Sequence, residues 1–500
     1  LTEDQVKRIH EASLEILKNT GLLVRNEKAR MRFHEHGCDV DFETELVKFP
    51  RELVEKCLKL IPPEFTFFAR DPAYDVTLPS QTPVVATASS APDIIDPVTG
   101  EERRATSEDI ARIAHVVNEL DGIDVFSIST LADDAPEGHF SLSRFYTALK
   151  NCIKPCRTSV IDLREAEQVL KLGALIAGSE EAFKERPSIT FGYCSIVSPL
   201  TMEFDSTEML MFFAENDLNA YGTVAPVGGA GTPLSLPGTL ALINAEWMTT
   251  CVLTQITKPG RPMIYNFLPV FTDMRDGAYA PGAIETGIMS SAICQMARHY
   301  NIPSGSYLGL TNAKTSDAQA GFEKGMSPMM GTLSGINYIV MGGLLDALMT
   351  FDFGQLAIDS EIALMLKRAV RGMDFSEENL ALDEIHKAGP GGMFIGNPET
   401  LAGMKNVCLL PDLANRDIRE KWNMFGQRSI HQRALDKIKA ILTKPNENVL
   451  PPEIDALIRA EFEGLVAGDS TPPGDWTAPE QVRGRGGNAG RRGARRRAGA

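Results

Sequence analysis

Cysteine, aromatic residues and long apolar runs are all scarce in this 500-residue chain. The eight cysteines are scattered, which excludes a disulfide framework and is typical of reduced thiols in a cytoplasmic protein. Cys152 and Cys156 lie close together, but no second Cys or His pair accompanies them, so we expect no metal site. No stretch of about 18 apolar residues lacks charges or helix breakers, so no membrane span is predicted. Leu1–Gln5 does not resemble a signal peptide and reads as a trimmed start.

Positive charge is also scarce outside the last twenty residues. The net charge is -16, and residues 481–500 hold seven arginines and no acid, so residues 1–480 carry -23. An acidic body argues against nucleic-acid binding. The Gly/Arg-rich tail, placed at 470–500, is predicted to be disordered, either as a solvated end or as a contact for RNA or an acidic partner.

Apolar runs and amphipathic stretches alternate along most of the chain. The strand-like runs are 123–130, 156–161, 189–197, 220–227, 262–267, 303–310, 338–341 and 392–395, and 84–90 is a further small-residue run of this kind. Helical patterns lie between them at 164–177, 239–255, 281–300, 317–330 and 355–370. About eight strand–helix units over roughly 270 residues favour an α/β fold, the closed (β/α)8 TIM barrel.

This pattern gives a four-part organisation. Residues 1–80 are predicted as an N-terminal helical extension, 81–388 as the barrel, 389–469 as a C-terminal helical segment packed on the barrel, and 470–500 as the tail. No glycine fingerprint for a dinucleotide or a triphosphate follows any of the strands, since the Gly-rich stretch 228–231 has no Lys-Ser/Thr after it.

In a barrel the active site lies at the carboxyl ends of the strands, and this rule selects the binding candidates. Besides Pro226, the loop 228–231, Asn266, Thr311, Asn312 and Asp352, which lie at the same ends, they are Tyr193, Ser195, Tyr221, Tyr265, Phe267, Tyr307, Lys314 and Phe351. Six are aromatic, in a chain with only 7% aromatic residues. Ring faces attract quaternary ammonium groups, so a cation-binding pocket is the preferred interpretation. The alternative is that the rings simply fill layers of the barrel core.

Several motifs, in a fixed order, resemble the corrinoid-dependent trimethylamine methyltransferase family. They are Asp96-Pro97-Val98-Thr99-Gly100, Asn244-Ala245-Glu246, Thr311-Asn312-Ala313-Lys314 with Asp317-Ala318-Gln319-Ala320, and Gly389-Pro390-Gly391-Gly392. The resemblance extends from about residue 1 to 463. It implies a barrel enzyme that moves a methyl group from a methylated amine to the Co(I) of a separate corrinoid protein, with no cofactor bound tightly in this chain.

Within these motifs Asn312, Asp317 and Glu246 are the catalytic candidates. Two have a second interpretation: Glu246 as an exposed or N-terminal helix residue, and Asp317 as the cap of the helix that follows it. Lys314 either anchors a substrate carboxylate or meets an acidic partner surface. Co(I) is itself a strong nucleophile, so the absence of a catalytic triad is consistent with this chemistry.

Two departures from the family pattern narrow the substrate. The founding enzyme carries pyrrolysine, whereas this chain contains only standard residues, which favours a quaternary amine, glycine betaine foremost, over trimethylamine. Many relatives follow the Gly-Pro-Gly-Gly motif with His where this chain has Met393, and 338–343 lacks the His of betaine-type relatives. An uncharged substrate tail therefore stays an alternative to a carboxylate.

Three functional hypotheses follow from the sequence. The first is a quaternary-amine methyltransferase whose partners are a corrinoid protein and a small cationic substrate, with a homo-oligomer left open. The second is a barrel that binds betaine-like cations without catalysis. The third is a different barrel enzyme, such as a metal-dependent lyase.

Overall fold

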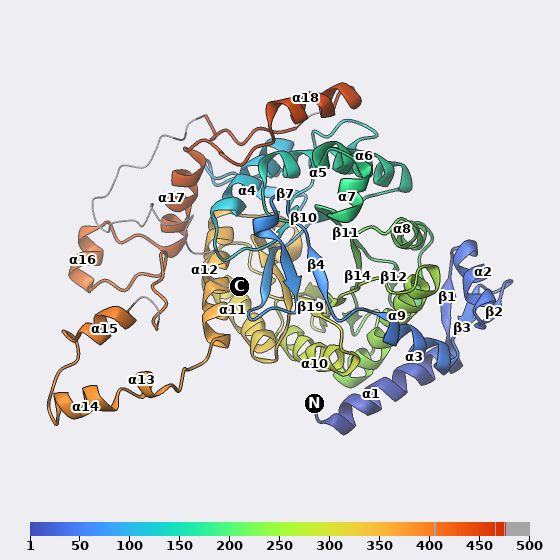
Figure 1. The fold of residues 1–500 in the computed structure, drawn as a ribbon, viewed down its shortest axis with the longest axis horizontal. Helices are drawn as coiled ribbons and strands as arrows, with labels where there is room; N and C mark the ends of the chain where they lie inside the picture. Colours follow the sequence, from blue (N-terminus) through green and yellow to red (C-terminus); the bar gives the residue numbers. More distant parts are fainter. Residues whose placement is uncertain (405–406, 466, 475, 477–500) are drawn as a thin grey trace.

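The computed structural model describes residues 1–404, 407–465, 467–474 and 476. Its centre is one closed barrel of eight parallel strands, surrounded by helices (Figure 1). The strands are β6 (Val84–Thr87), β9 (Phe126–Ser127), β10 (Cys156–Thr158), β11 (Ile189–Tyr193), β14 (Ala220–Val224), β16 (Tyr265–Phe267), β19 (Ser304–Tyr307) and β20 (Tyr338–Gly342). A parallel bridge between Ala86 and Val125 joins β6 to β9, which closes the barrel and confirms the predicted fold class.

One predicted strand, 392–395, is wrong. The first barrel strand is instead β6, which comes from the small-residue run 84–90 and pairs with β20, with Val85 opposite Ile339. The run 392–395 forms no strand, because it lies in an exposed connection between two short helices and has no neighbouring sheet edge. Three consecutive apolar residues after a Gly-Pro-Gly-Gly turn have the sequence pattern of a buried strand, but here they are exposed.

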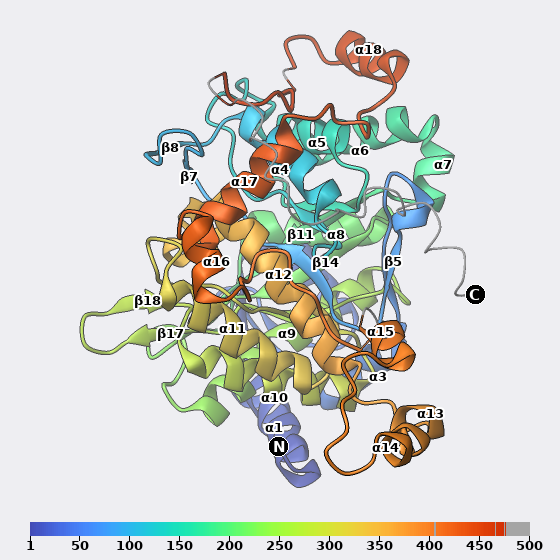
Figure 2. The same cartoon turned by 90° about the vertical axis from the view of Figure 1, so that its left-hand side faces the viewer.

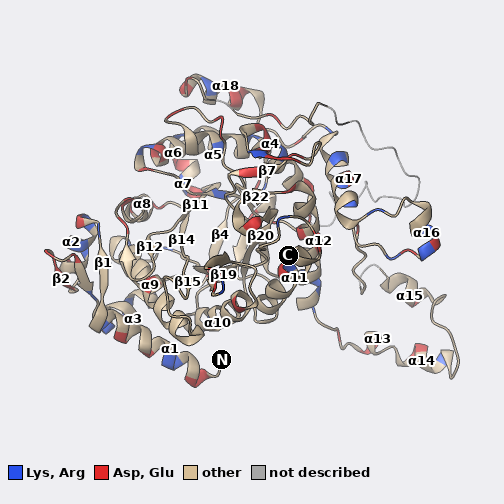
Figure 3. Cartoon of the chain, turned by 180° about the vertical axis from the view of Figure 1, so that it is seen from behind, with Lys and Arg blue, Asp and Glu red and all other residues tan. Residues whose placement is uncertain are grey.

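The helices between the strands lie on the outside of the barrel. They are α4 (Ser107–Glu119), α5 (Phe140–Asn151), α6 (Leu163–Ala177), α7 (Glu180–Glu185), α8 (Phe204–Glu215), α9 (Leu236–Thr257), α10 (Ile284–Tyr300), α11 (Ala318–Leu333) and α12 (Phe353–Val370). Charged residues of both signs lie on outer helices such as α6 (Figure 3). No described helix is both long and apolar enough to cross a membrane.

Short hairpins extend the connections at the carboxyl ends of the strands and form the mouth of the barrel. They are β7 (Asp93–Ile95) with β8 (Glu102–Arg104), β12 (Ile196–Val197) with β13 (Thr201–Met202), β17 (Val270–Asp273) with β18 (Ala278–Ala280), and β21 (Leu344–Leu345) with β22 (Thr350–Phe351). β15 (Val227–Gly228) pairs with β17. Figure 2 shows β7, β8, β17 and β18 on one side of the molecule.

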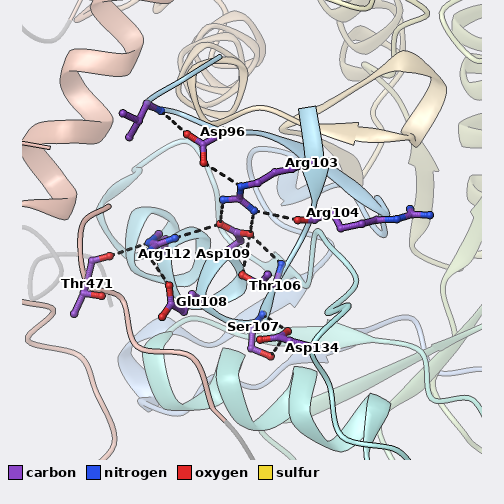
Figure 4. A network of polar contacts seen from close by, with 11 residues as sticks. Asp96, Arg103, Arg104, Thr106, Ser107, Glu108, Asp109, Arg112, Asp134 and Thr471 are labelled. Atoms are coloured by element: carbon purple, nitrogen blue, oxygen red, sulfur yellow. Dashed lines mark hydrogen bonds and ion pairs between the residues drawn. The ribbon is translucent and has the colours of Figure 1, made fainter. Parts of the chain in front are cut away.

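The first family motif forms the turn of the β7–β8 hairpin. The Oδ1 atom of Asp96 accepts the backbone N–H groups of Val98 and Thr99, while its Oδ2 atom accepts Nε of Arg103 at 3.0 Å. Arg103 also donates two hydrogen bonds to buried Asp109, at the start of α4 (Figure 4). The motif therefore fixes a mouth hairpin to its helix, and its contacts among the described residues are structural.

The opposite end of the barrel is closed by the hairpin of β4 (Phe65–Phe67) and β5 (Val76–Leu78). The rings of Phe65 and Phe67 contact the ring of Tyr221, and Phe67 also lies 5.0 Å from the ring of Tyr338. All four side chains are buried, so this hairpin is an aromatic floor to the barrel.

The N-terminal region consists of α1 (Glu3–Glu15), α2 (Glu27–Glu35), α3 (Arg51–Leu60) and a small sheet, of β1 (Leu22–Val24), β2 (Asp39–Asp41) and β3 (Leu46–Lys48). The predicted capping box at Thr2 and Gln5 is present. β1 also pairs with β13, which connects this region to a mouth hairpin.

The C-terminal region differs in its two halves. α17 (Ile430–Leu442) packs against α12 and α4, and α18 (Pro452–Glu461) packs against α6. Residues 371–412, which include α13 (Glu377–Leu380), α14 (Leu382–Ala388) and α15 (Pro398–Gly403), extend away from the barrel (Figures 1 and 2). We call this segment the arm; none of its described residues is buried. α16 (Arg419–Met424) follows it.

The predicted tail begins inside the described chain. The carbonyl oxygen of Thr471 accepts a hydrogen bond from Arg112, and Trp476 packs against the core. The remainder of the predicted tail, 475 and 477–500, lies outside the described residues.

Candidate functional site

A buried arginine occupies the interior of the barrel. Arg157 is the middle residue of β10 and is 4% exposed. Its Nη2 atom donates to the hydroxyl oxygen of Tyr307 at 2.6 Å, and its guanidinium carbon lies 5.5 Å from the ring centre of Tyr221 and 5.9 Å from that of Tyr307. A methyl group added at Gly192 would lie 2.7 Å from Nη1, so the glycine makes room for the guanidinium.

This guanidinium has no counter-charge among the described residues. The Nε atom of Arg157 has no hydrogen-bond partner there. The guanidinium lies among the phenols of Tyr221, Tyr307 and Tyr338, and Nη2 also donates to the hydroxyl of Ser89 at 3.5 Å. Asn266, on β16, presents a second unpaired buried atom, Oδ1, while its Nδ2 donates to Thr223. Buried polar atoms are nearly always paired, so these two indicate space for a polar ligand or water.

A second buried arginine lies beside the first. Arg144, on α5, donates to the carbonyl oxygens of Thr130 and Ile128 and to the hydroxyl of Ser90. Burial and the charge of Arg157 lower the pKa of Arg144 to about 10, so it stays protonated near neutral pH. The two guanidinium groups together make this part of the barrel positive.

Towards the mouth, a thiol and two phenols lie close together. Cys194 follows β11 and is exposed, yet desolvation raises the pKa of its thiol to about 11. The phenol of Tyr279, on β18, has its pKa raised to about 12 by burial, with smaller contributions from Tyr307 and Cys194. An exposed thiol with a raised pKa is consistent with a position in the wall of a concave surface.

The candidate aromatic residues do not gather in one pocket. Tyr307 and Tyr221 face the interior, Tyr307 beside Arg157 and Tyr221 at the floor. Tyr193, Tyr265 and Phe267 face outward. The ring of Tyr193 lies 6.1 Å from that of Phe213 on α8, and Tyr265 contacts Trp247 on α9 as well as Phe267.

The two remaining mouth candidates are also packed away from the interior. Ser195 shares a hydrogen bond with Thr250 on α9. Phe351, on β22, is fully buried and packs against Phe353 and against the backbone of Gly343. A strand reverses its side-chain direction at every residue, so proximity to a strand end does not by itself place a side chain in the mouth.

Glu246 is buried on α9 behind the β12–β13 hairpin. Its Oε2 atom accepts the hydroxyl of Ser198 at 2.7 Å, and its Oε1 atom accepts the backbone N–H of Leu200 at 2.8 Å. Burial raises its pKa to about 7, because these two hydrogen bonds only partly offset the cost of removing the carboxylate from water. Glu246 thus holds a mouth loop and titrates near neutrality.

Asn312 and Asp317 belong to the loop that precedes α11. The amide of Asn312 accepts Gly282 N–H and donates to the carbonyl of Tyr279, so it connects two mouth loops. Asp317 is exposed and caps α11 by accepting the N–H groups of Gln319 and Ala320. Lys314 is 69% exposed, 2.9 Å from Asp346. The structure brings Asn312 close to Tyr279, but places Asp317 and Lys314 outside the interior.

The sequence interpretation missed Arg157, Arg144 and Tyr279, whereas the strand-end rule selected Asn266. A signal for Arg157 was present, since it is a charged residue inside the otherwise strand-like run 156–161. No comparable signal marked Arg144, which lies on a helix whose burial only the fold reveals. Within the described residues no three His, Cys, Asp or Glu side chains gather in a way that could hold a metal.

Comparison with known proteins identifies the family of this barrel. The family model of trimethylamine methyltransferase (MTTB) matches residues 1–463. A glycine betaine methyltransferase of Desulfitobacterium hafniense is 34% identical over 93% of this chain and 96% of its own length. The trimethylamine methyltransferase MttB of another strain of that species is 31% identical over 92% and 93%.

A solved structure agrees with the fold. The monomethylamine methyltransferase MtmB of Methanosarcina barkeri aligns over 92% of this chain and 93% of its own, with a TM-score of 0.50 and 14% identity. That likeness concerns the fold alone. The match over residues 1–463 and the 34% identity with a full-length relative show that the chain belongs to the trimethylamine methyltransferase (MTTB) family.

Proposed function

We propose that this chain transfers a methyl group from a quaternary amine to the Co(I) of a corrinoid carried by a separate protein. The observation that carries the proposal is the family match over nearly the whole described chain, in a sequence built only of standard residues. The glycine betaine methyltransferase among its relatives supports a quaternary donor.

The chemistry needs little from the protein's own acids and bases. The cobalt lone pair forms the new Co–C bond, the C–N bond breaks, and its electron pair stays on nitrogen, which leaves as a neutral tertiary amine. No proton moves, and cobalt is formally oxidised from +1 to +3. The protein supplies placement of the methyl group and removal of water from the reacting atoms.

The described mouth is suited to this task. Tyr279 and Tyr307 place aromatic rings there, which attract a quaternary ammonium without the tight ground-state binding that a carboxylate would give. Glu246 and Asn312 hold the surrounding loops, so we propose them as positioning residues rather than as groups that contact the reacting atoms.

The test is methylation of free cob(I)alamin under anaerobic conditions, followed by visible absorbance. Trimethylamine, glycine betaine, choline and carnitine would each be offered to the purified chain. Formation of methyl-Co(III) with a quaternary donor supports the proposal. Methylation from trimethylamine alone would replace the quaternary donor with a tertiary one. Binding of donors without methylation, also when corrinoid proteins are supplied, would favour the binding barrel.

A further inference from the structure

We propose that Arg157 binds a carboxylate group of the methyl donor, so that the donor is a betaine, with an anion at one end and the quaternary nitrogen at the other. This inference rests on the proposed function and deepens it by naming a specificity-determining residue. Neither the matched motifs nor the relatives' names assign a role to this arginine.

The first argument is that Arg157 is an uncompensated buried charge. It is 96% buried, its Nε atom is unpaired among the described residues, and the groups that contact the guanidinium, the phenols and the hydroxyl of Ser89, carry no negative charge. Other buried cations of the barrel are paired: Lys324 donates to Asp359, and Lys154 donates to three backbone carbonyls. Burying an arginine without an anion is costly, so a group that is absent from the chain itself is expected to complete it.

The second argument is that the surroundings hold the guanidinium in a fixed position. The hydroxyl oxygen of Tyr307 accepts a hydrogen bond from Nη2, the ring of Tyr221 lies against the guanidinium, and Gly192 leaves space beside Nη1. A planar guanidinium held in this way presents parallel N–H groups that match a carboxylate. Arg144 adds a second positive charge close by, which strengthens the attraction for an anion.

The third argument concerns the donor's own charge. A methyl donor for Co(I) carries a positive nitrogen, and choline or trimethylammonium would be repelled by two guanidinium groups in a poorly solvated interior. A betaine avoids this repulsion when its carboxylate faces Arg157 and its ammonium faces outward. The ring of Tyr307 lies beside the guanidinium and that of Tyr279 lies towards the mouth, so an outward ammonium meets aromatic faces.

The test compares ligands as well as variants. Calorimetry measures binding of glycine betaine, its methyl ester, choline and phosphocholine to the wild-type chain, and free cob(I)alamin reports methyl transfer from each. The ester keeps the quaternary ammonium but has no carboxylate. We expect glycine betaine to bind about 100-fold more tightly than the ester and choline, since a hydrogen-bonded charge pair is lost. Tighter binding of phosphocholine would overturn the carboxylate in favour of a phosphate.

The variants are Arg157→Met, Arg157→Lys and, as a matched control, Arg164→Met, which removes an exposed arginine of α6 whose ion pair within the described part of the chain is with Asp162. We expect about 100-fold weaker betaine binding in R157M, about 10-fold in R157K, which keeps the charge but not the planar fork, and no change in R164M. Unchanged binding in a folded R157M, or equal turnover of choline and betaine by the wild type, overturns the inference.

The two proposals fail in different ways. Suppose that betaine binding requires Arg157 but no donor methylates cobalt, even when corrinoid proteins are supplied. The carboxylate site is then supported and the proposed methyl transfer is contradicted. If choline is the methylated donor and R157M is as active as the wild type, methyl transfer stands and the carboxylate site falls. Should R157M not fold, the comparison of betaine with its ester in the wild-type chain decides the matter.

Discussion

The barrel interior and the arm both depart from the usual rule that polar side chains are exposed and apolar ones buried. The interior buries Arg157 and the unpaired oxygen of Asn266, whereas the arm exposes large apolar side chains. In the arm these are Met373, Phe375, Leu380, Leu382, Ile385, Met393, Phe394, Ile395, Leu401, Met404, Val407 and Leu410. A buried polar group and an exposed apolar patch are both informative, because each lacks a partner. The first calls for a small polar ligand and the second for a macromolecular surface.

The largest expected effect separates a paired buried cation from an unpaired one. Lys324 and Asp359 are both fully buried, 2.9 Å apart, so Lys324→Met leaves a buried carboxylate without its cation, held only by hydrogen bonds from Gly343 and Gln355 among the described residues. We expect a loss of about 4 kcal/mol in the free energy of unfolding, measured by urea denaturation. Lys314→Met is the control, with a loss under about 1 kcal/mol, because its pair with Asp346 is exposed. Equal losses would contradict the distinction.

A second prediction concerns pH. Folding raises the pKa of Glu246 from an ordinary value near 4.5 to about 7, so the folded state favours its protonated form. The resulting stability is fully present below pH 4.5 and is lost as the pH rises through about 7. The stability of the wild type relative to Glu246→Gln should therefore fall by about 3 kcal/mol across this range. A difference that is constant with pH would show that Glu246 does not titrate there.

The third prediction returns to Arg157. If its charge serves a ligand rather than the fold, Arg157→Met should change the unfolding free energy of the ligand-free chain by less than about 1 kcal/mol, or increase it. The measurement is urea denaturation beside Lys324→Met. A loss as large as that of the Lys324 variant would mean that Arg157 stabilises the fold. The barrel interior would then not require a ligand, unlike the exposed apolar side chains of the arm, which would still lack a partner surface.

The smallest effect on stability is expected in the arm. Met393 and Ile395 are 76% and 78% exposed, so changing both to Asp should alter the unfolding free energy by less than about 0.5 kcal/mol. The same variant should self-associate less at high concentration, as measured by light scattering, because it removes two large apolar side chains from an exposed surface. Unchanged association would exclude the arm as the contact.

The barrel was predictable because its signals are local and repeated. Helices such as α6 and α12 begin and end within two residues of their predicted limits. Each of the eight barrel strands lies within, or overlaps, a strand-like run of the sequence. The run 392–395 failed because three apolar residues cannot report whether a sheet edge lies nearby. In the site, the rule that selects strand ends identified Tyr307, but it could not tell the inward direction of Tyr307 from the outward direction of Tyr193.

The residues that matter most to the site were hidden for a physical reason. Arg144 reaches the carbonyl oxygens of Thr130 and Ile128 only because α5 packs against β10, the neighbour of β9, and Tyr279 reaches the mouth only through the β17–β18 hairpin. Such contacts join distant segments, and no single window of sequence contains them. Arg157 alone carried a local sign, a charge inside a buried strand.

The aromatic floor formed by β4 and β5 has a kinetic consequence. Phe65, Phe67, Tyr221 and Tyr338 seal that end, so among the described residues the mouth is the open end of the barrel. Under the proposed function, a corrinoid protein that receives the methyl group would cover this same opening. The donor would then bind before the corrinoid protein docks and the demethylated amine would depart after it leaves, which would make the order of the reaction cycle compulsory.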